Sequence, residues 1–258
     1  MSIYLKTIKM HMKSALEYKK SFILTTIATF LLTFLMTISI YLLFEKFGSL
    51  EGWDFFDVAI TFGIIMFAFS FTEMFARGFD HFHNAVREGD FDRLLLKPAS
   101  LLAQVASYEF EPSKLGRMIQ AGIVLFIAVF NINVEWNLYR IFILLCMQIS
   151  AIVLFWSIFI IKATVSFWTI DGLEFMNILS EGGKKVAQYP INIYEKWFAR
   201  FFTFIVPFGL INYYPLLYLL GKSDCIWYGI LPIISMLFVI PTILFWNFGV
   251  KHYTSTGS

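Results

Sequence analysis

One apolar run near the start of the chain limits what the sequence can fold into. Residues 21–44 contain no charged side chain, and about 20 mostly apolar residues are enough to cross the hydrocarbon core of a bilayer. The run is longer than the roughly 7–15 apolar residues of a signal peptide. It leads into Glu45 and Lys46 without a small-residue cleavage site. We therefore predict a retained membrane-spanning helix.

The composition agrees with a protein that folds inside a membrane. Hydrophobic residues make up 59% of the chain and charged residues 15%, whereas charged residues are about 25% of an average soluble domain. A chain with so little polar surface is not a disordered tail, a secreted disulfide-rich protein or a basic protein that binds nucleic acid. The two cysteines, Cys146 and Cys225, lie in or beside apolar runs and predict neither a disulfide framework nor a zinc site.

Further apolar runs predict an all-α integral membrane protein with six transmembrane helices. After residues 21–44, the runs that hydropathy identifies cover residues 55–75, 119–132 extended by 115–118, 136–161, 201–220 and 226–250. We expect them to form a single transmembrane domain over residues 1–258. The lipid bilayer is therefore a partner of this chain.

The basic residues predict which ends of the spans face the cytoplasm. Lysines are concentrated in residues 1–20, and lysines and arginines in residues 76–117, whereas the loops after the first and third spans are acidic or nearly neutral. Cytoplasmic loops carry the excess of Lys and Arg in membrane proteins. We therefore expect cytoplasmic N- and C-termini, a cytoplasmic 76–117 segment and an even number of crossings, most simply six.

Two alternatives stay open for the fifth span. Hydropathy selects residues 201–220, but Pro207 and Pro215 divide that run, and a proline inside a helix costs about 3 kcal/mol. In the other alternative, residues 163–187 cross and the later run forms a re-entrant pair of short helices. That crossing would hold four polar residues, which are Asp171, Glu174, Asn177 and Glu181. The charge distribution favours the first alternative, and the prolines favour the second.

The first 20 residues have the pattern of a helix that lies on a membrane surface. Lysines recur along one face, and an apolar stripe lies opposite. The lysines are Lys6, Lys9, Lys13 and Lys20, and the apolar residues are Tyr4, Ile8, Met12 and Ala15. Such a helix is attracted to an anionic surface by its charges while its apolar face enters the interface. The alternative is a basic segment that lies in water, and whose lysines only reflect the excess of Lys and Arg on the cytoplasmic side.

The cytoplasmic segment contains a short predicted helix, which Gly89 and Pro98 bracket. Phe91, Leu94 and Leu95 share one face of this helix by their spacing. Charged residues surround that face, and they are Asp90, Asp92, Arg93 and Lys97. A helix of this kind docks into the groove of a partner protein, or it packs on its own bundle, and both alternatives remain open.

The sequence offers little that could carry out a reaction. His81 and His83 lie in an acidic stretch, residues 80–92, and His and carboxylate side chains are ligands of catalytic metals. The pattern is weak, and we expect no metal, no cofactor and no catalytic residue on this chain. The alternative is a membrane-embedded enzyme that acts on a lipid through residues 80–92. Ionisable residues near span boundaries, such as Glu73 and Lys162, are expected to snorkel to the interface.

Three stretches of the chain stand out as motifs: residues 89–98 read GDFDRLLLKP, residues 189–194 read YPINIY and residues 202–215 read FTFIVPFGLINYYP. Together they resemble the permease subunits of bacterial type-2 ABC exporters, in particular small six-span permeases that are encoded with a second permease and a separate ATPase. The similarity covers essentially the whole chain. It implies a protein of the bacterial inner membrane that exports a substrate by alternating access.

The resemblance also assigns roles to individual residues. In such permeases a coupling helix between the second and third spans contacts the ATPase, and re-entrant helices precede the last span. The expected ATPase contacts are Asp90, Phe91, Asp92, Arg93, Leu94, Leu95 and Lys97. The expected breaks around a re-entrant segment of about 191–220 are Pro190, Pro207 and Pro215. The implied partners are ABC ATPase subunits, which would bind ATP and Mg, and a second permease subunit.

Overall fold

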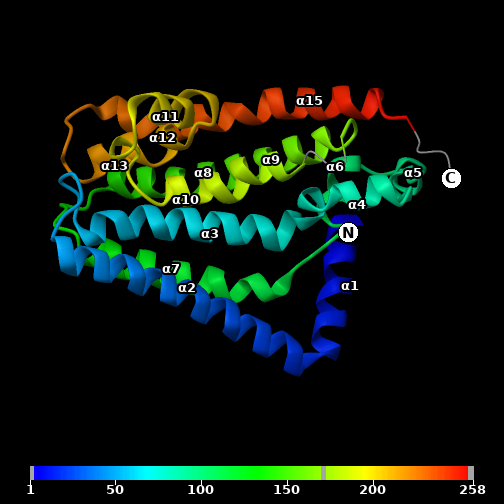
Figure 1. Cartoon of the computed structure of the whole chain (residues 1–258), viewed down its shortest axis with the longest axis horizontal. Helices are drawn as coiled ribbons and strands as arrows, with labels where there is room; N and C mark the ends of the chain where they lie inside the picture. Colours follow the sequence, from blue (N-terminus) through cyan, green and yellow to red (C-terminus); the bar gives the residue numbers. More distant parts are fainter. Residues whose placement is uncertain (1–2, 170–172, 255–258) are drawn as a thin grey trace.

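The protein is a bundle of helices in the computed structural model, which describes residues 3–169 and 173–254 (Figure 1). Within these residues all regular secondary structure is helical. The long helices run parallel or antiparallel to one another, and their ends gather at two opposite ends of the bundle. The all-α membrane fold expected from the apolar runs is confirmed.

The helices follow the apolar runs of the sequence closely. The first part contains α1 (Ile3–Glu17), α2 (Lys19–Phe47), α3 (Phe55–Asp80), α4 (Phe82–Arg87), α5 (Asp90–Leu95), α6 (Leu101–Ala106), η1 (Pro112–Lys114) and α7 (Leu115–Asn131). The middle contains α8 (Leu138–Val165), α9 (Leu173–Asn177), the π-helical turn η2 (Ile178–Gly182), α10 (Gly183–Ala187), η3 (Ile191–Ile193) and α11 (Lys196–Arg200). The last part contains the π-helical turn η4 (Phe201–Ile205), α12 (Phe208–Ile211), α13 (Tyr213–Leu219), η5 (Ile226–Ile230), α14 (Leu231–Ser235), η6 (Met236–Phe238) and α15 (Val239–Lys251).

Five helical segments in the described part of the chain are long and apolar enough to cross a membrane. They are Lys19–Phe47, Phe55–Arg87, Pro112–Asn131, Leu138–Val165 and Ile226–Lys251. Among them α3 is central, because α7 and α8 pack along it and nearly all its side chains from Asp57 to Met66 are buried. In contrast, α2 exposes apolar side chains along most of its length, as a helix that faces lipid does.

We give the name fifth crossing, after its expected role, to α9, η2 and α10 together, which are residues 173–187. Figure 1 shows α1 and the last turns of α15 at the same end of the bundle, the arrangement expected for an even number of crossings. Residues 173–187 run beside α8 and α3 toward the opposite end. The segments Lys196–Ile205 and Phe208–Leu219 meet at a bend of 75° and stay near that opposite end. The 201–220 run is thus not one straight span, and a crossing at about 163–187 followed by a re-entrant run stays a prediction.

The breaks in the segment expected to be re-entrant lie beside two of the three expected prolines. Pro190 follows α10, and Pro207 stands between η4 and α12. Pro215 is wrong as a break, because it lies in the first turn of α13, where a missing backbone N–H costs no helical hydrogen bond. The break falls at Asn212 instead, whose Nδ2 donates to the carbonyl oxygen of Ala187 at 2.9 Å.

α1 crosses the end of the bundle that carries the termini (Figure 1). The Tyr4 hydroxyl donates to the carbonyl oxygen of Phe75 at 2.9 Å. The other residues of the expected apolar stripe, Ile8, Met12 and Ala15, are also half-buried. The lysines of α1, which are Lys6, Lys9 and Lys13, are exposed. α1 ends at Glu17, so Lys20 belongs to the first turn of α2 and not to the helix expected at the interface.

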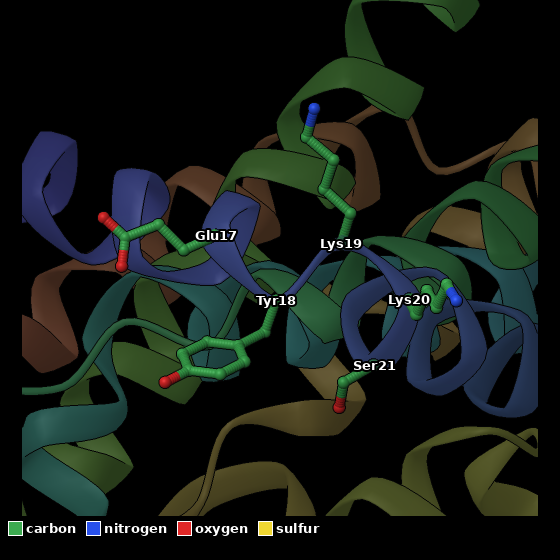
Figure 2. A pocket seen from close by; sticks show the side chains of 5 residues that line it. All are labelled: Glu17, Tyr18, Lys19, Lys20 and Ser21. Carbon is green, nitrogen blue, oxygen red and sulfur yellow. The ribbon is translucent and has the colours of Figure 1, made fainter.

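Figure 2 shows the elbow between α1 and α2, where a hollow is lined by Glu17, Tyr18, Lys19, Lys20 and Ser21. The charged side chains point in different directions. Because they do not converge, they offer no common position for a ligand. The hollow follows from the change of chain direction between the two helices.

Candidate functional site

Aromatic side chains hold α5 against the bundle. Gly89 precedes this helix at φ 73°, in the left-handed conformation that favours glycine. The Phe91 side chain is fully buried. Its ring centroid lies 5.1 Å from that of Phe82, 5.3 Å from that of Phe167 and 4.9 Å from that of Tyr253. These rings come from α4, from just after α8 and from just after α15, so α5 packs directly on the ends of two spans.

The exposed surface of the α5 segment differs from the expected one. Phe91 and Leu94 are 0% and 6% exposed, so the prediction that their side chains contact an ATPase is wrong in this conformation. Both fill the chain's own core instead. Of the other expected contacts, Arg93, Leu95 and Lys97 are exposed. The periodic pattern missed Leu96, which is 86% exposed, because it follows the last turn of α5.

Asp90 fixes the first turn of α5. Its carboxylate accepts hydrogen bonds from the Tyr108 hydroxyl at 2.8 Å and from the Arg93 guanidinium at 3.2 Å. Burial, and then the hydrogen bond to Asp90, raise the pKa of Tyr108 to about 12. The hydroxyl therefore keeps its proton and donates at neutral pH. Asp92, in the same turn, is half-buried.

A buried carboxylate gathers three cations near the same end of the bundle. Glu73 of α3 is 3% exposed. Its oxygens lie 2.9 Å from Arg77 Nη1, 3.5 Å from Lys114 Nζ and 2.6 Å from Arg117 Nη1. We call these four residues the Glu73 cluster. It joins α3 to η1 and α7, and the expectation that Glu73 snorkels to the interface is wrong.

A second buried ion pair lies next to this cluster. Lys162 Nζ lies 2.6 Å from Asp80 Oδ1 and donates to Asn177 Oδ1 at 2.8 Å. Lys162 is thus buried and paired, and its expected snorkelling is also wrong. The contacts join α3, α8 and α9. The same residues line a polar cavity of about 360 Å³, which Glu181 and His83 also border.

The fifth crossing exposes polar side chains where lipid cannot solvate them. The exposed residues are Glu174, Asn177, Glu181 and Lys185. Their spacing puts them along one side of a helix, and we call this set the polar stripe. Lys184 is buried beside it, 2.5 Å from Glu181 Oε2 and with its Nζ 3.9 Å from the centre of the Phe69 ring. Asp171, also expected on this crossing, lies outside the described residues.

Of the two histidines at 81 and 83, His81 joins the end of α3 to the segment after α6. His81 Nδ1 lies 2.6 Å from Glu109 Oε2, and Asp80 is engaged with Lys162. The His81 and His83 rings meet edge to face, with centroids 6.4 Å apart. Across residues 3–169 and 173–254 no group of three or more His, Cys, Asp or Glu side chains could hold a metal ion.

At the opposite end of the bundle, one lysine joins two loops. Lys222 Nζ lies 2.7 Å from Asp57 Oδ2, donates to the carbonyl oxygen of Gly52 at 2.9 Å and stands 4.0 Å from the centre of the Trp53 ring. Trp53 Nε1 donates to Asn192 Oδ1 at 3.0 Å. The α2–α3 loop and the start of α3 thus hold residues 192–222 near both ends of that stretch. The sequence carries no signal for this contact, because Lys222 and Asp57 are 165 positions apart.

Comparison with known proteins agrees with this architecture. A family model described as ABC-2 family transporter protein matches residues 30–257. A search of curated proteins and a search of solved structures each found no match. The matched residues extend from α2 to beyond α15 and so cover the membrane-spanning part of the chain. The family implies association with an ABC ATPase. The chain therefore belongs to the ABC-2 transporter family, as a membrane-embedded permease of an ABC transporter.

Proposed function

We propose that the chain is one permease of an ATP-driven exporter in the bacterial inner membrane. It pairs with a second permease, and separate ATPase subunits bind ATP and Mg and hydrolyse ATP in the cytoplasm. The two chain ends and the α4–α6 segment face the cytoplasm, in line with the distribution of Lys and Arg. The paired permeases open the pathway alternately to the two sides of the membrane.

The exposed tip of the α5 segment makes the contact with the ATPase. Arg93, Leu96 and Lys97 project from a base that Phe91 fastens to the ends of α8 and α15. A rigid base transmits a displacement of the tip to the spans, because closely packed side chains do not deform continuously. ATP binding shifts the equilibrium between the two openings of the pathway only if the contacts between the ATPase and the tip differ between these two states. This exposed tip on a packed base is the observation that carries the proposal.

Changing the chemistry of the tip should release the ATPase. In the double variant Leu96→Asp/Lys97→Glu we expect co-purification of the ATPase to fall roughly tenfold or more, as for interface residues that contribute about 2 kcal/mol. The amount of permease in the membrane should stay unchanged, because both positions are exposed. Lys13→Glu on the exposed face of α1 is the matched control and should retain the ATPase. Undiminished association in the double variant would refute the contact.

The polar stripe borders the pathway between the two permeases. Charged side chains within spans face protein or water-filled cavities and not lipid. Glu174 and Lys185 therefore need another protein surface or a water-filled space beside them. The polar cavity lies beside the stripe, and Asn177 and Glu181 belong to both. These contacts support a hydrated pathway along the fifth crossing, completed by the second permease.

Cysteine labelling measures whether water reaches the stripe. In a background with Cys146→Ala and Cys225→Ala, the variant Glu181→Cys should react with a charged, water-soluble maleimide roughly tenfold faster than Leu35→Cys, because the reagent does not enter lipid. Leu35 is the matched control, since it is 57% exposed on the apolar surface of α2. Equally slow reaction at both positions would show that the stripe does not border a hydrated pathway.

A further inference from the structure

The most accessible charge in the polar cavity beside the fifth crossing is negative. The charged residues of its lining are Arg77, Asp80, Lys162 and Glu181. The Lys162 and Asp80 side chains are 8% and 11% exposed and pair with each other. The Arg77 side chain, which is 18% exposed, also pairs with Asp80. The Glu181 side chain is 51% exposed, so an entering molecule meets its carboxylate before the other three groups.

The chain's own Lys184 shows which kind of group this carboxylate accepts. Lys184 Nζ lies 2.5 Å from Glu181 Oε2 and 3.9 Å from the centre of the Phe69 ring. Phe69 lines the same cavity, and the rings of Phe155 and Phe159 meet it edge to face, with centroids 5.1 Å and 5.9 Å away. The face of an aromatic ring attracts a cation, more strongly where water is excluded. The carboxylate and the ring together therefore hold an ammonium group at the border of the cavity.

The ammonium of Lys184 is a tethered occupant of this position. It is carried on a flexible four-carbon stem, and a tethered group competes with a free cation for the same contacts. Glu181 lies in the π-helical turn η2, and α10, which contains Lys184, follows directly. Single π-helical turns inside α-helices are frequent at functional sites. The side chain and the local backbone thus both suit a position whose occupant is exchanged.

We propose that an organic cation binds in this cavity, with its ammonium group at Glu181 and Phe69 in place of the ammonium of Lys184. The carboxylate makes the site selective, because it repels an anion and gives a neutral molecule no ion pair. Phe159, also on the lining, adds apolar wall for the rest of the ligand. The inference rests on the proposed function in one respect, since it names amines with an apolar group as the substrate class of the pathway along the polar stripe.

Calorimetric titration of the purified full-length chain in zwitterionic lipid nanodiscs tests the site, with the heat from empty nanodiscs subtracted. The probe is benzyltrimethylammonium, a permanent cation with one aromatic ring. Lys184→Ala should bind the probe roughly tenfold more tightly than the wild type, because the tethered competitor is absent. Lys185→Ala is the matched control. It removes the same charge at the next position, but Lys185 is exposed, so the affinity should change by less than about twofold.

Two further variants and a neutral probe separate a cation site from an apolar hollow. Adding Glu181→Gln to Lys184→Ala should weaken binding of the cation roughly tenfold, because the ion pair is lost and the ring contact remains. Adding Glu174→Gln instead should keep the gain, since Glu174 is exposed and does not line the cavity. Benzyl alcohol, which carries no charge, should bind Lys184→Ala and the wild type equally.

Two results would overturn the proposal. One is equal affinity of Lys184→Ala and Lys185→Ala for benzyltrimethylammonium, and the other is an equal gain for benzyl alcohol. The titration needs neither the ATPase nor the second permease, so its failure is distinct from failure of the proposed function. If Glu181→Cys reacts fast with the maleimide but Lys184→Ala gains no affinity, the hydrated pathway stands without the cation site. A gain in affinity with slow maleimide reaction supports the cation site without the pathway.

Discussion

Glu73→Ala is expected to lower the free energy of unfolding by about 3–5 kcal/mol, because removing one partner of a buried ion pair leaves uncompensated charge. Arg77, Lys114 and Arg117 all lie within 3.5 Å of the Glu73 carboxylate. Without that carboxylate, Arg117 loses its ion-pair partner, whereas Arg77 and Lys114 still lie within ion-pair distance of Asp80 and Glu111. The purified protein should unfold at a Tm lower by about 10 °C, since 1 kcal/mol shifts the Tm of a protein of this size by about 2–4 °C.

An exposed carboxylate at the same end of the bundle provides the control. Glu88 is exposed, so Glu88→Ala should change the free energy of unfolding by less than about 0.5 kcal/mol. The double variant Glu73→Gln/Arg117→Gln should recover part of the loss, because it removes a cation together with the carboxylate. Equal Tm values for Glu73→Ala and Glu88→Ala would contradict a central role for the Glu73 cluster.

Features that depend on residues close to one another in the sequence could be predicted from it. The third span was expected at 119–132 with an extension at 115–118, and α7 covers Leu115–Asn131. The short helix expected between Gly89 and Pro98 is α5, Asp90–Leu95. Both follow from local signals, since an apolar run needs a helix in lipid and a glycine or proline limits where that helix can continue.

Contacts between distant parts of the chain could not be predicted in this way. Glu73 and Arg117 are 44 positions apart, and Asp80 and Lys162 are 82 positions apart. Nothing in the local pattern separates a buried paired residue from one that snorkels, because both occur near the ends of apolar runs. The two ion pairs form because α3 packs against α7 and against α8.

The fifth crossing and α5 show why hydropathy and periodicity were ambiguous. Residues 173–187 are polar on one side, so a hydropathy scan ranks them below the broken run at 201–220. For α5, the sequence left open whether the helix faces a partner or its own bundle. In the structure one side of this segment packs on the bundle and the other is open, since Phe91 is buried in the core while Leu96 is exposed. The side that a six-residue helix buries depends on its neighbours, and the sequence does not show them.

Gly116→Ala is expected to force α2 away from α7 and to cost about 1–3 kcal/mol or more in free energy of unfolding. A Cβ atom at position 116 would stand 1.9 Å from the carbonyl oxygen of Thr26 and 2.6 Å from Thr29 Oγ1. The first of these atoms belongs to the backbone, so no side-chain rotation relieves the contact. Thr29 Oγ1 also donates to the carbonyl oxygen of Ser113 at 2.9 Å. Separating the helices therefore weakens that hydrogen bond as well.

Gly122 on the same helix is the matched control for this prediction. A Cβ atom there would meet nothing closer than Phe67 Cδ2 at 3.8 Å. Alanine is favoured over glycine inside a helix by about 1 kcal/mol, so Gly122→Ala should unfold at or above the wild-type Tm. Helix propensity alone gives the same gain at both positions. A lower Tm for Gly116→Ala than for Gly122→Ala therefore measures the close approach of α2 and α7, and equal Tm values would show that this approach does not stabilise the protein.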